Sequence, residues 1–370
     1  MKLGILIIGG LIALLGGELL ARSFDLDLRI LRKTLYYQCG LLSLYRTSAE
    51  AQRLFELVPG KTVEGLPGAH PKETKYSKVD FSINDLGFRG RSFPAAKKEG
   101  VFRIVIFGGS SAFGATVSDE DTYPAQLQKI FDEKCPGKVE VWNAGISAYV
   151  MSQNVAYAET VVKKYDPDLL IFQDTNTGRR AFGYTAPLAE IKGLFRKNRE
   201  LFIENIPPLW NQDVLPTGEP LRLAASVATK IHNFWVVRSA FYRGLCLIFY
   251  HQKGAFVDGQ PVNPITERYG SAWASKGQEI SDRELGLFVE RHQNIKIRLL
   301  FLSDFPPWVV RSGILTKKNV KTFILPTEGM PPEYREVHPP SYVYAWSAQK
   351  LYDLLIQEDL FLLTGIRCRA

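Results

Sequence analysis

The sequence is poor in cysteine and lacks the spacings that mark zinc or redox sites. Cys39, Cys135, Cys246 and Cys368 form no Cys-x-x-Cys pair, so neither a zinc site nor a thioredoxin-like motif is encoded. We therefore expect no metal and no cofactor. In an exported chain one or two disulfides could form, whereas four buried thiols fit equally well, and the sequence does not pair the cysteines.

The chain also lacks internal repeats and the signatures of nucleic-acid binding. No period of about 20 to 50 residues recurs, which excludes a solenoid, and there is no zinc-finger spacing or RNP-type strand. Lysine and arginine number 46 against 38 acidic residues, which gives a net charge of +8. Because the basic residues are scattered, we expect no nucleic-acid partner. An anionic membrane or an acidic glycan remains open.

Only one long apolar run is present, and it lies at the N-terminus. It extends from Leu3 to Gly17, and after Glu18 three more apolar residues follow. We predict that residues 1–22 form a membrane anchor or an uncleaved signal, and that residues 3–21 contact the lipid bilayer. A leucine three positions before the best cleavage site disfavours removal. The basic residues after the run favour the cytoplasm for that flank, but the catalytic motifs below favour a body in the periplasm, at the bacterial inner membrane.

Residues 23–100 fall into two parts. From Phe24 to Leu57 apolar residues recur amid charged ones, which predicts one or two membrane-proximal amphipathic helices. Residues 58–100 are dense in glycine and proline. Both residue types end helices, so we expect an extended connector there.

Short apolar runs then alternate with helical patterns. The predicted strands are 101–107, 138–142, 168–172 and 296–302, and the predicted helices are 123–133, 152–164, 283–291 and 342–356. Such alternation predicts an α/β domain over residues 101–370, with a parallel sheet and helices on both faces. The stretch from about 181 to 281 fits less well, and we interpret it as an insertion. Ligands are expected beyond the carboxyl ends of the strands.

A serine follows the first predicted strand in a glycine-rich turn, GGSSAFG at 108–114. A serine between a strand end and a helix start exposes its hydroxyl at the sheet edge, and helix-terminal N–H groups there can bind an oxyanion. Ser110 therefore has the setting of a nucleophile. The turn contains neither Gly-x-Gly-x-x-Gly nor Gly-Lys-Ser/Thr, which disfavours a phosphate-binding loop.

Other segments follow this turn in a recognisable order. They are NAGISAY at 143–149, the segment ending in Asn176, and EVHPPSYVYAWSAQKL at 336–351. With GGSSAFG, and with INDLGFRGRSF at 83–93, these blocks resemble the SGNH (GDSL-like) hydrolase family, in particular its membrane-anchored bacterial members. The resemblance implies a three-layer flavodoxin-like fold. It also implies that Ser110 is the nucleophile, that His338 is its base, and that the oxyanion is held by the N–H groups of Ser110 and Ala148 and the Asn176 side chain.

The sequence departs from the family pattern at several positions. Gly109 replaces the aspartate before the serine, and Ala148 replaces a glycine whose N–H it can still supply. The third block lacks the usual Gly-x-Asn-Asp around Asn176. Arg335 stands where the family has an aspartate three residues before the histidine.

An arginine cannot orient an imidazole, so another group must complete the triad. The choices are Glu336, Glu333, a distant acid such as Asp304, or no third residue. We favour Glu336, because residues two apart in an extended loop share a face and its carboxylate can meet the His338 ring.

Two functions from different classes follow. The first is a serine esterase, or an acyl-ester transferase or deacylase, acting on O-acyl groups of an envelope glycan or a lipid. The alternative is a catalytically inactive SGNH-like body that serves as a binding or scaffold subunit of a membrane complex, with a membrane protein as partner. We favour the first, and the alternative is suggested by the departures at Arg335, Ala148 and the third block.

Overall fold

The computed structural model divides the chain into two compact units. One comprises Met1–Gly40 with Phe182–Gly277, and the other comprises Leu41–Ala181 with Gln278–Ala370. The structure describes residues 2–30, 44–50, 52–53, 55–67, 69–147, 149–173, 219–252, 271–301, 320–326, 328–335 and 338–358, together with isolated positions between 189 and 261.

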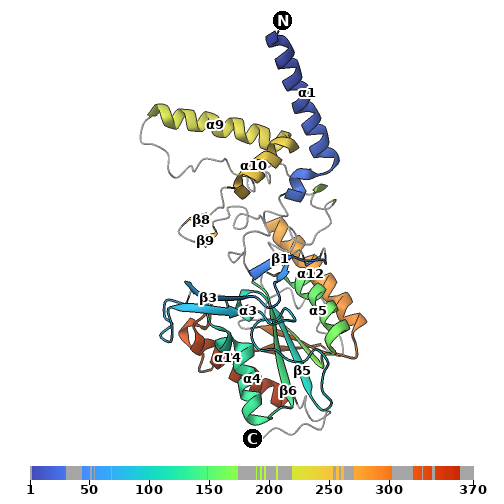
Figure 1. The fold of residues 1–370 in the computed structure, drawn as a ribbon, viewed down its shortest axis with the longest axis vertical. Helices are drawn as coiled ribbons and strands as arrows, with labels where there is room; N and C mark the ends of the chain where they lie inside the picture. Colours follow the sequence, from blue (N-terminus) through green and yellow to red (C-terminus); the bar gives the residue numbers. More distant parts are fainter. Residues whose placement is uncertain are drawn as a thin grey trace. The chain divides into compact units, whose positions relative to one another are not determined.

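A parallel sheet forms the centre of the second unit (Figure 1). Its strands are β5 (Phe102–Gly108), β6 (Val139–Gly145), β7 (Leu169–Gln173), β10 (Lys296–Phe301) and β11 (Val320–Ile324). They lie in the order β11-β10-β7-β5-β6, and all neighbouring pairs are parallel. The predicted parallel α/β sheet is confirmed, and its order is the flavodoxin-like one, in which the second strand flanks the first on the side away from the others. Strand β11 was not predicted.

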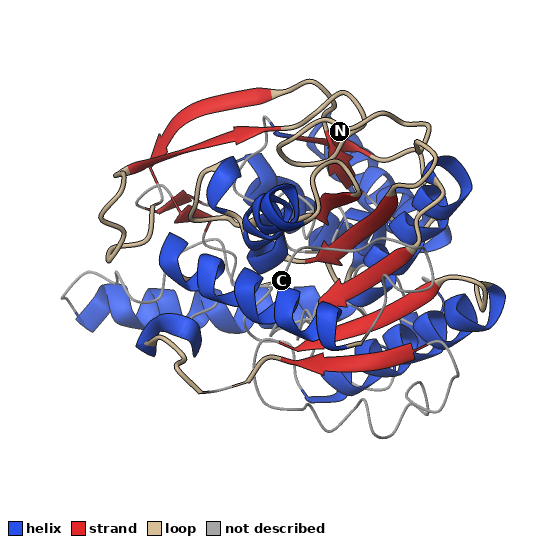
Figure 2. Ribbon diagram, turned by 90° about the horizontal axis from the view of Figure 1, so that it is seen from below, coloured by secondary structure: helices blue, strands red, loops and turns tan. Residues whose placement is uncertain are grey.

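Helices cover both faces of this sheet (Figure 2). The helices α4 (Tyr123–Lys134) and α14 (Ser341–Gln357) pack together on one face, and α5 (Met151–Tyr165) and α12 (Ser271–Arg291) contribute to the other. Successive side chains of β5 point to opposite faces of the sheet. Ile106 packs in the core cluster with residues of α4 and α14, whereas the ring of Phe107 contacts the ring of Tyr157 in α5. Burial on both faces explains why the strands are continuous apolar runs.

The segment before the sheet contains β-structure that we did not predict. β1 (Tyr45–Thr47) pairs antiparallel with β2 (Phe55–Leu57), so the amphipathic helices expected from Phe24 to Leu57 are wrong at these positions. Within the expected connector, β3 (Thr62–Pro67) pairs antiparallel with β4 (Lys78–Ser82). The physical reason is burial of alternate side chains, as in β2 and β4, which is the period of a strand. Residues 31–43 lie outside the described residues.

The longest described helices that lie wholly in the first unit contact one another near their ends. They are α1 (Lys2–Ser23), α9 (Glu219–Arg238) and α10 (Ala240–Gln252), and the short strands β8 (Phe256–Val257) and β9 (Gln260–Pro261) pair antiparallel. The Glu18 carboxylate accepts hydrogen bonds from the Ser239 hydroxyl at 2.7 Å and from the N–H groups of Ala240 at 3.1 Å and Phe241 at 3.0 Å. The acidic residue that interrupts the apolar run of α1 therefore caps the N-terminus of α10.

Two expectations from the sequence concern membranes and cysteines. Among the helices that the structure describes, none combines the length and the apolar character needed to cross a bilayer. The anchor at residues 1–22 stays a prediction. Cys135 is disulfide-bonded and Cys246 is a free, buried thiol, so the alternative of four thiols is wrong.

Candidate active site

The structure brings Ser110 and His338 together at the carboxyl end of the sheet. β5 ends at Gly108, and the short helix α3 (Ser110–Phe113) begins at the serine. The Ser110 Oγ lies 2.6 Å from the His338 Nε2, although 228 residues separate the two in the chain. Such a hydrogen bond is what a base needs to activate a hydroxyl. The serine follows β5, the strand at which the order of the sheet reverses, and open α/β sheets bind ligands at that point.

The turn that carries Ser110 packs directly against the end of β6. A Cβ on Gly145 would lie 2.6 Å from the carbonyl carbon of Ala112, and still closer to the backbone nitrogen of Phe113. Gly114 ends α3 with φ of 81°, and its N–H donates to the Ser110 carbonyl at 2.8 Å. Glycine is required at both positions, by close approach at the first and by a left-handed backbone at the second.

We expect Gly145→Ala to reduce ester hydrolysis at least 100-fold, because the added methyl group must displace the backbone behind Ser110 and small misplacements at a reacting centre cost about that much. Overpacking of this kind destabilises by about 1–3 kcal/mol. The matched control is Gly286→Ala in α12, where a Cβ meets nothing within 4 Å. Rates with a p-nitrophenyl ester and thermal melting curves measure both effects. Equal activity in the two variants would show that the close approach does not fix the serine.

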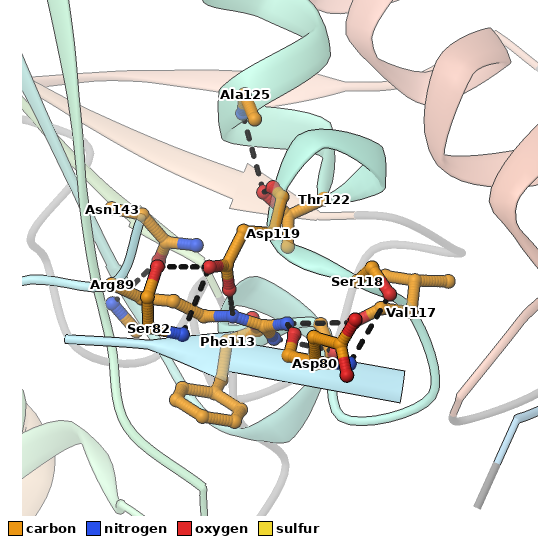
Figure 3. A network of polar contacts seen from close by, with 12 residues as sticks. Asp80, Ser82, Arg89, Phe113, Val117, Ser118, Asp119, Thr122, Ala125 and Asn143 are labelled. Carbon is orange, nitrogen blue, oxygen red and sulfur yellow. Dashed lines mark hydrogen bonds and ion pairs between the residues drawn. The ribbon is translucent and has the colours of Figure 1, made fainter. Parts of the chain in front are cut away.

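A buried arginine, Arg89, binds the chain that follows Ser110 (Figure 3). Its guanidinium donates to the carbonyl oxygens of Phe113, of Gly114 at 2.6 Å and of Val117 at 2.6 Å. The Nε donates to the Asp119 Oδ1 at 2.9 Å. Carbonyls at a helix end lack intrahelical donors, and the planar fork of an arginine can serve several acceptors at once. Arg89 therefore fixes the end of α3 while Asp119 compensates its charge.

Arg89 belongs to the segment INDLGFRGRSF, and contacts of this segment with β6 fix the position of the arginine. The backbone N–H of Arg89 donates to the Asn143 carbonyl at 3.1 Å, and this hydrogen bond joins the segment to β6. The bend before it is built by Asn84, whose Oδ1 accepts from the N–H groups of Leu86 and Phe88, both at 3.0 Å. No role of Arg89 was predicted from the sequence. The one signal in the sequence was the place of Arg89, between a phenylalanine and a glycine in a block that resembles the family.

Two contacts hold the loop that carries His338. The Glu73 Oε2 accepts the N–H of Ser341, the first residue of α14, at 2.8 Å. Burial alone would raise the pKa of Glu73, but hydrogen bonds, chiefly from the backbone of Ser341 and Lys75, outweigh it and lower the pKa. On the other side, the Thr116 hydroxyl donates to the Pro339 carbonyl at 3.0 Å. These contacts restrict the position of the histidine relative to α3.

The carboxylate of Glu333, one choice for the third member of a triad, binds a lysine. Glu333 lies in the short helix η5 (Pro332–Arg335), and its Oε1 is 2.8 Å from the Lys72 Nζ. Hydrogen bonds from Lys72 and Tyr342 lower the pKa of Glu333 to about 2. The remaining predicted site residues lie outside the described residues, and their roles stay predictions: Ala148, Asn176, Asp304 and Glu336.

Gln173, at the end of β7, reaches the same edge of the sheet. Its Oε1 accepts a hydrogen bond from the Tyr123 hydroxyl at 2.8 Å. A Cβ on Gly108 would lie 3.2 Å from the Gln173 Cβ, so this side chain packs beside the turn that leads to Ser110. Among the described residues, no group of histidine, cysteine and acidic side chains is arranged to hold a metal ion.

Comparison with known proteins finds solved structures that are similar at low sequence identity. No protein-family model and no curated protein matches the sequence. Similar solved structures include TesA, with 12% identity and a TM-score of 0.35 over 68% of this chain and 97% of that chain. A catalytic mutant of Axe2, an acetylxylan esterase from Geobacillus stearothermophilus, has 10% identity and a TM-score of 0.32 over 70% and 95%. The acetyl xylan esterase Est2A from the rumen bacterium Butyrivibrio proteoclasticus has 11% identity and a TM-score of 0.34 over 72% and 66%.

Proposed function

We propose that the chain is a serine ester hydrolase in which Ser110 is the nucleophile and His338 the general base. The observation that carries the proposal is the 2.6 Å hydrogen bond between the Ser110 Oγ and the His338 Nε2. It lies beyond the carboxyl end of β5, where a substrate can approach a flavodoxin-like sheet. Glycine packing and the Arg89 contacts hold the serine, and the Glu73 and Thr116 contacts hold the histidine loop.

The reaction follows from this geometry. Neutral His338 takes the hydroxyl proton as the Ser110 Oγ bonds to the ester carbonyl carbon, and it then gives that proton to the departing alcohol. The acyl group is left on Ser110. Water, or the hydroxyl of an acceptor in a transferase, attacks the acyl-enzyme by the reverse route. We assign the oxyanion to the N–H groups of Ser110 and Ala148 and the Asn176 amide, and the orientation of the imidazole to Glu336.

For the substrate we propose O-acyl groups of an envelope glycan or a lipid, reached by a body in the periplasm at the bacterial inner membrane. The disulfide at Cys135 supports an oxidising compartment, because such bonds are rare in the cytosol. The net charge of +8 supports an acidic polymer or an anionic surface as the neighbour.

Labelling with a fluorophosphonate probe tests the serine mechanism. We expect the folded protein to be labelled, with the adduct on Ser110 in the tryptic peptide of residues 104–129. Ser110→Ala should abolish labelling, and Ser111→Ala, one residue along α3, should retain it. Labelling that persists in Ser110→Ala would contradict the assignment of the nucleophile. No labelling of the folded wild-type protein would favour the inactive scaffold.

A further inference from the structure

The outward face of α9 is apolar. Five large side chains on this helix are 48% to 68% exposed: Leu223, Val227, Ile231, Phe234 and Trp235. Their spacing places them on one stripe of the helix, which we call the α9 stripe. The opposite side is packed, since His232 and Val236 are buried and the His232 ring is hydrogen-bonded to the Ile206 carbonyl and the Tyr242 hydroxyl. A surface helix of a soluble domain ordinarily shows the reverse arrangement, with its polar side outward.

Exposed apolar side chains also lie on α1, in the same unit. Leu11, Ile12, Leu15 and Leu19 of α1 are 56% to 67% exposed. The ends of α1 and α9 are tied together, because an Arg22 nitrogen donates to the Arg238 carbonyl at 2.6 Å. Isolated exposed leucines are normal, whereas large apolar patches mark interaction sites. The five neighbouring apolar side chains of the α9 stripe therefore mark an interaction site.

The charges around the α9 stripe indicate what covers it. From residue 219 to residue 252 the only acidic residue is Glu219, against the basic residues Arg222, Lys230, Arg238 and Arg243. Arg243 is paired with Asp27 at 2.6 Å, but Lys230 and Arg238 are exposed. The Arg238 guanidinium lies over the Phe234 ring, 4.0 Å from its centroid, beside Trp235. A basic border with aromatic residues at one end is typical of helices that lie in the headgroup region of a membrane.

We propose that the α9 stripe binds the surface of a bilayer that contains anionic phospholipid, with α9 lying in the plane of the membrane. The apolar side chains enter the boundary of the acyl chains, and Lys230 and Arg238 meet lipid phosphates. A second copy of this chain is a poorer occupant, because both copies would present the same basic border. The proposal adds a membrane contact to the one predicted for residues 1–22 and does not depend on the activity of Ser110.

Vesicle sedimentation of the full chain tests the proposal. We expect binding to vesicles of phosphatidylglycerol and phosphatidylethanolamine, with weaker binding to phosphatidylcholine and at high salt. The double substitution Val227→Asp with Ile231→Asp should lower the partition coefficient at least about tenfold, as expected from the loss of two buried aliphatic side chains. The matched control is Leu287→Asp in α12, an exposed apolar side chain of the other unit, which should bind like the wild-type chain. Both variants replace exposed residues, and their circular dichroism should match that of the wild type.

A second measurement separates α9 from any contact made by α1. Phospholipids with brominated acyl chains quench tryptophans that enter the membrane, and Trp235→Phe should remove the largest part of the quenching. Quenching that is unchanged in Trp235→Phe, or equal vesicle binding by the aspartate variant and its control, would overturn the proposal. Dimers that form without lipid and that Ile231→Asp dissociates would also overturn it, because the stripe would then be an interface between copies.

Discussion

Ser110→Ala is expected to lower the rate of hydrolysis of a short p-nitrophenyl ester by about 10⁴- to 10⁶-fold, with a melting temperature within a few degrees of the wild type. The rate falls because the substitution removes the hydroxyl that lies 2.6 Å from the His338 Nε2. Stability changes little, since the serine is only half-buried and the substitution removes one hydrogen bond of its side chain, which is worth about 1 kcal/mol.

His338→Ala should cause a loss of similar size, and the double variant should be no slower than either single one, because nucleophile and base act as a unit. His292→Ala is the control for removal of a histidine, since that ring follows the end of α12 and lies 3.0 Å from the Glu159 carboxylate of α5. The readout is steady-state kinetics of the purified protein. Activity within tenfold of the wild type in Ser110→Ala would exclude a serine mechanism.

Arg89→Met is expected to destabilise the protein by about 3–5 kcal/mol, because the buried guanidinium donates to three carbonyls and one carboxylate, and hydrogen bonds of charged groups are worth about 1.5–3 kcal/mol each. The substitution leaves the Asp119 carboxylate with its contacts from Ser82 and removes the guanidinium donors of the Phe113, Gly114 and Val117 carbonyls. Because these carbonyls follow Ser110, labelling by a fluorophosphonate should also slow under conditions in which the variant is still folded. Arg89→Lys should recover only part of the loss, because an ammonium group lacks the fork of a guanidinium.

The chain offers a matched control two residues away. Arg91 is exposed and pairs with Asp132 at 2.5 Å, so Arg91→Met should change the free energy of unfolding by no more than about 0.5–1 kcal/mol. Urea denaturation of the three variants gives the comparison. Equal midpoints for Arg89→Met and Arg91→Met would show that the Arg89 contacts do not stabilise the turn.

The sheet could be predicted from the sequence because its strands are buried on both faces. The short apolar runs at β5, β6, β7 and β10 lack helical periodicity, and the predicted strands overlap all four. β11 was missed because residues 320–324 read Val-Lys-Thr-Phe-Ile, in which two adjacent polar residues interrupt the apolar run, and because the segment follows a basic stretch. The pair β3 and β4 was missed because glycine and proline obscure the strand pattern that burial of Val79 and Phe81 reveals.

Some residues of the candidate site could also be predicted from the sequence, and others could not. Ser110 and His338 could be identified because each stands in a block with a characteristic order, and the structure places them in contact. Arg89 could not, since its role depends on three carbonyls and one carboxylate that come together only after the segment before the sheet has folded against β6. Backbone donors and acceptors cannot be recognised in a sequence, because nearly every residue carries both. The same applies to Glu73, whose partner is the N–H of Ser341.

The cap that Glu18 provides has a consequence for any shortened form of the chain. A cut after Ala21 would remove the carboxylate that binds Ser239, Ala240 and Phe241. The first turn of α10 would then begin with unsatisfied N–H groups and would fray, at a cost of about 1 kcal/mol for the lost cap alone. The side of α10 against which α1 packs would be exposed to solvent as well. Trimming the N-terminus to gain solubility would therefore expose new apolar surface in the first unit.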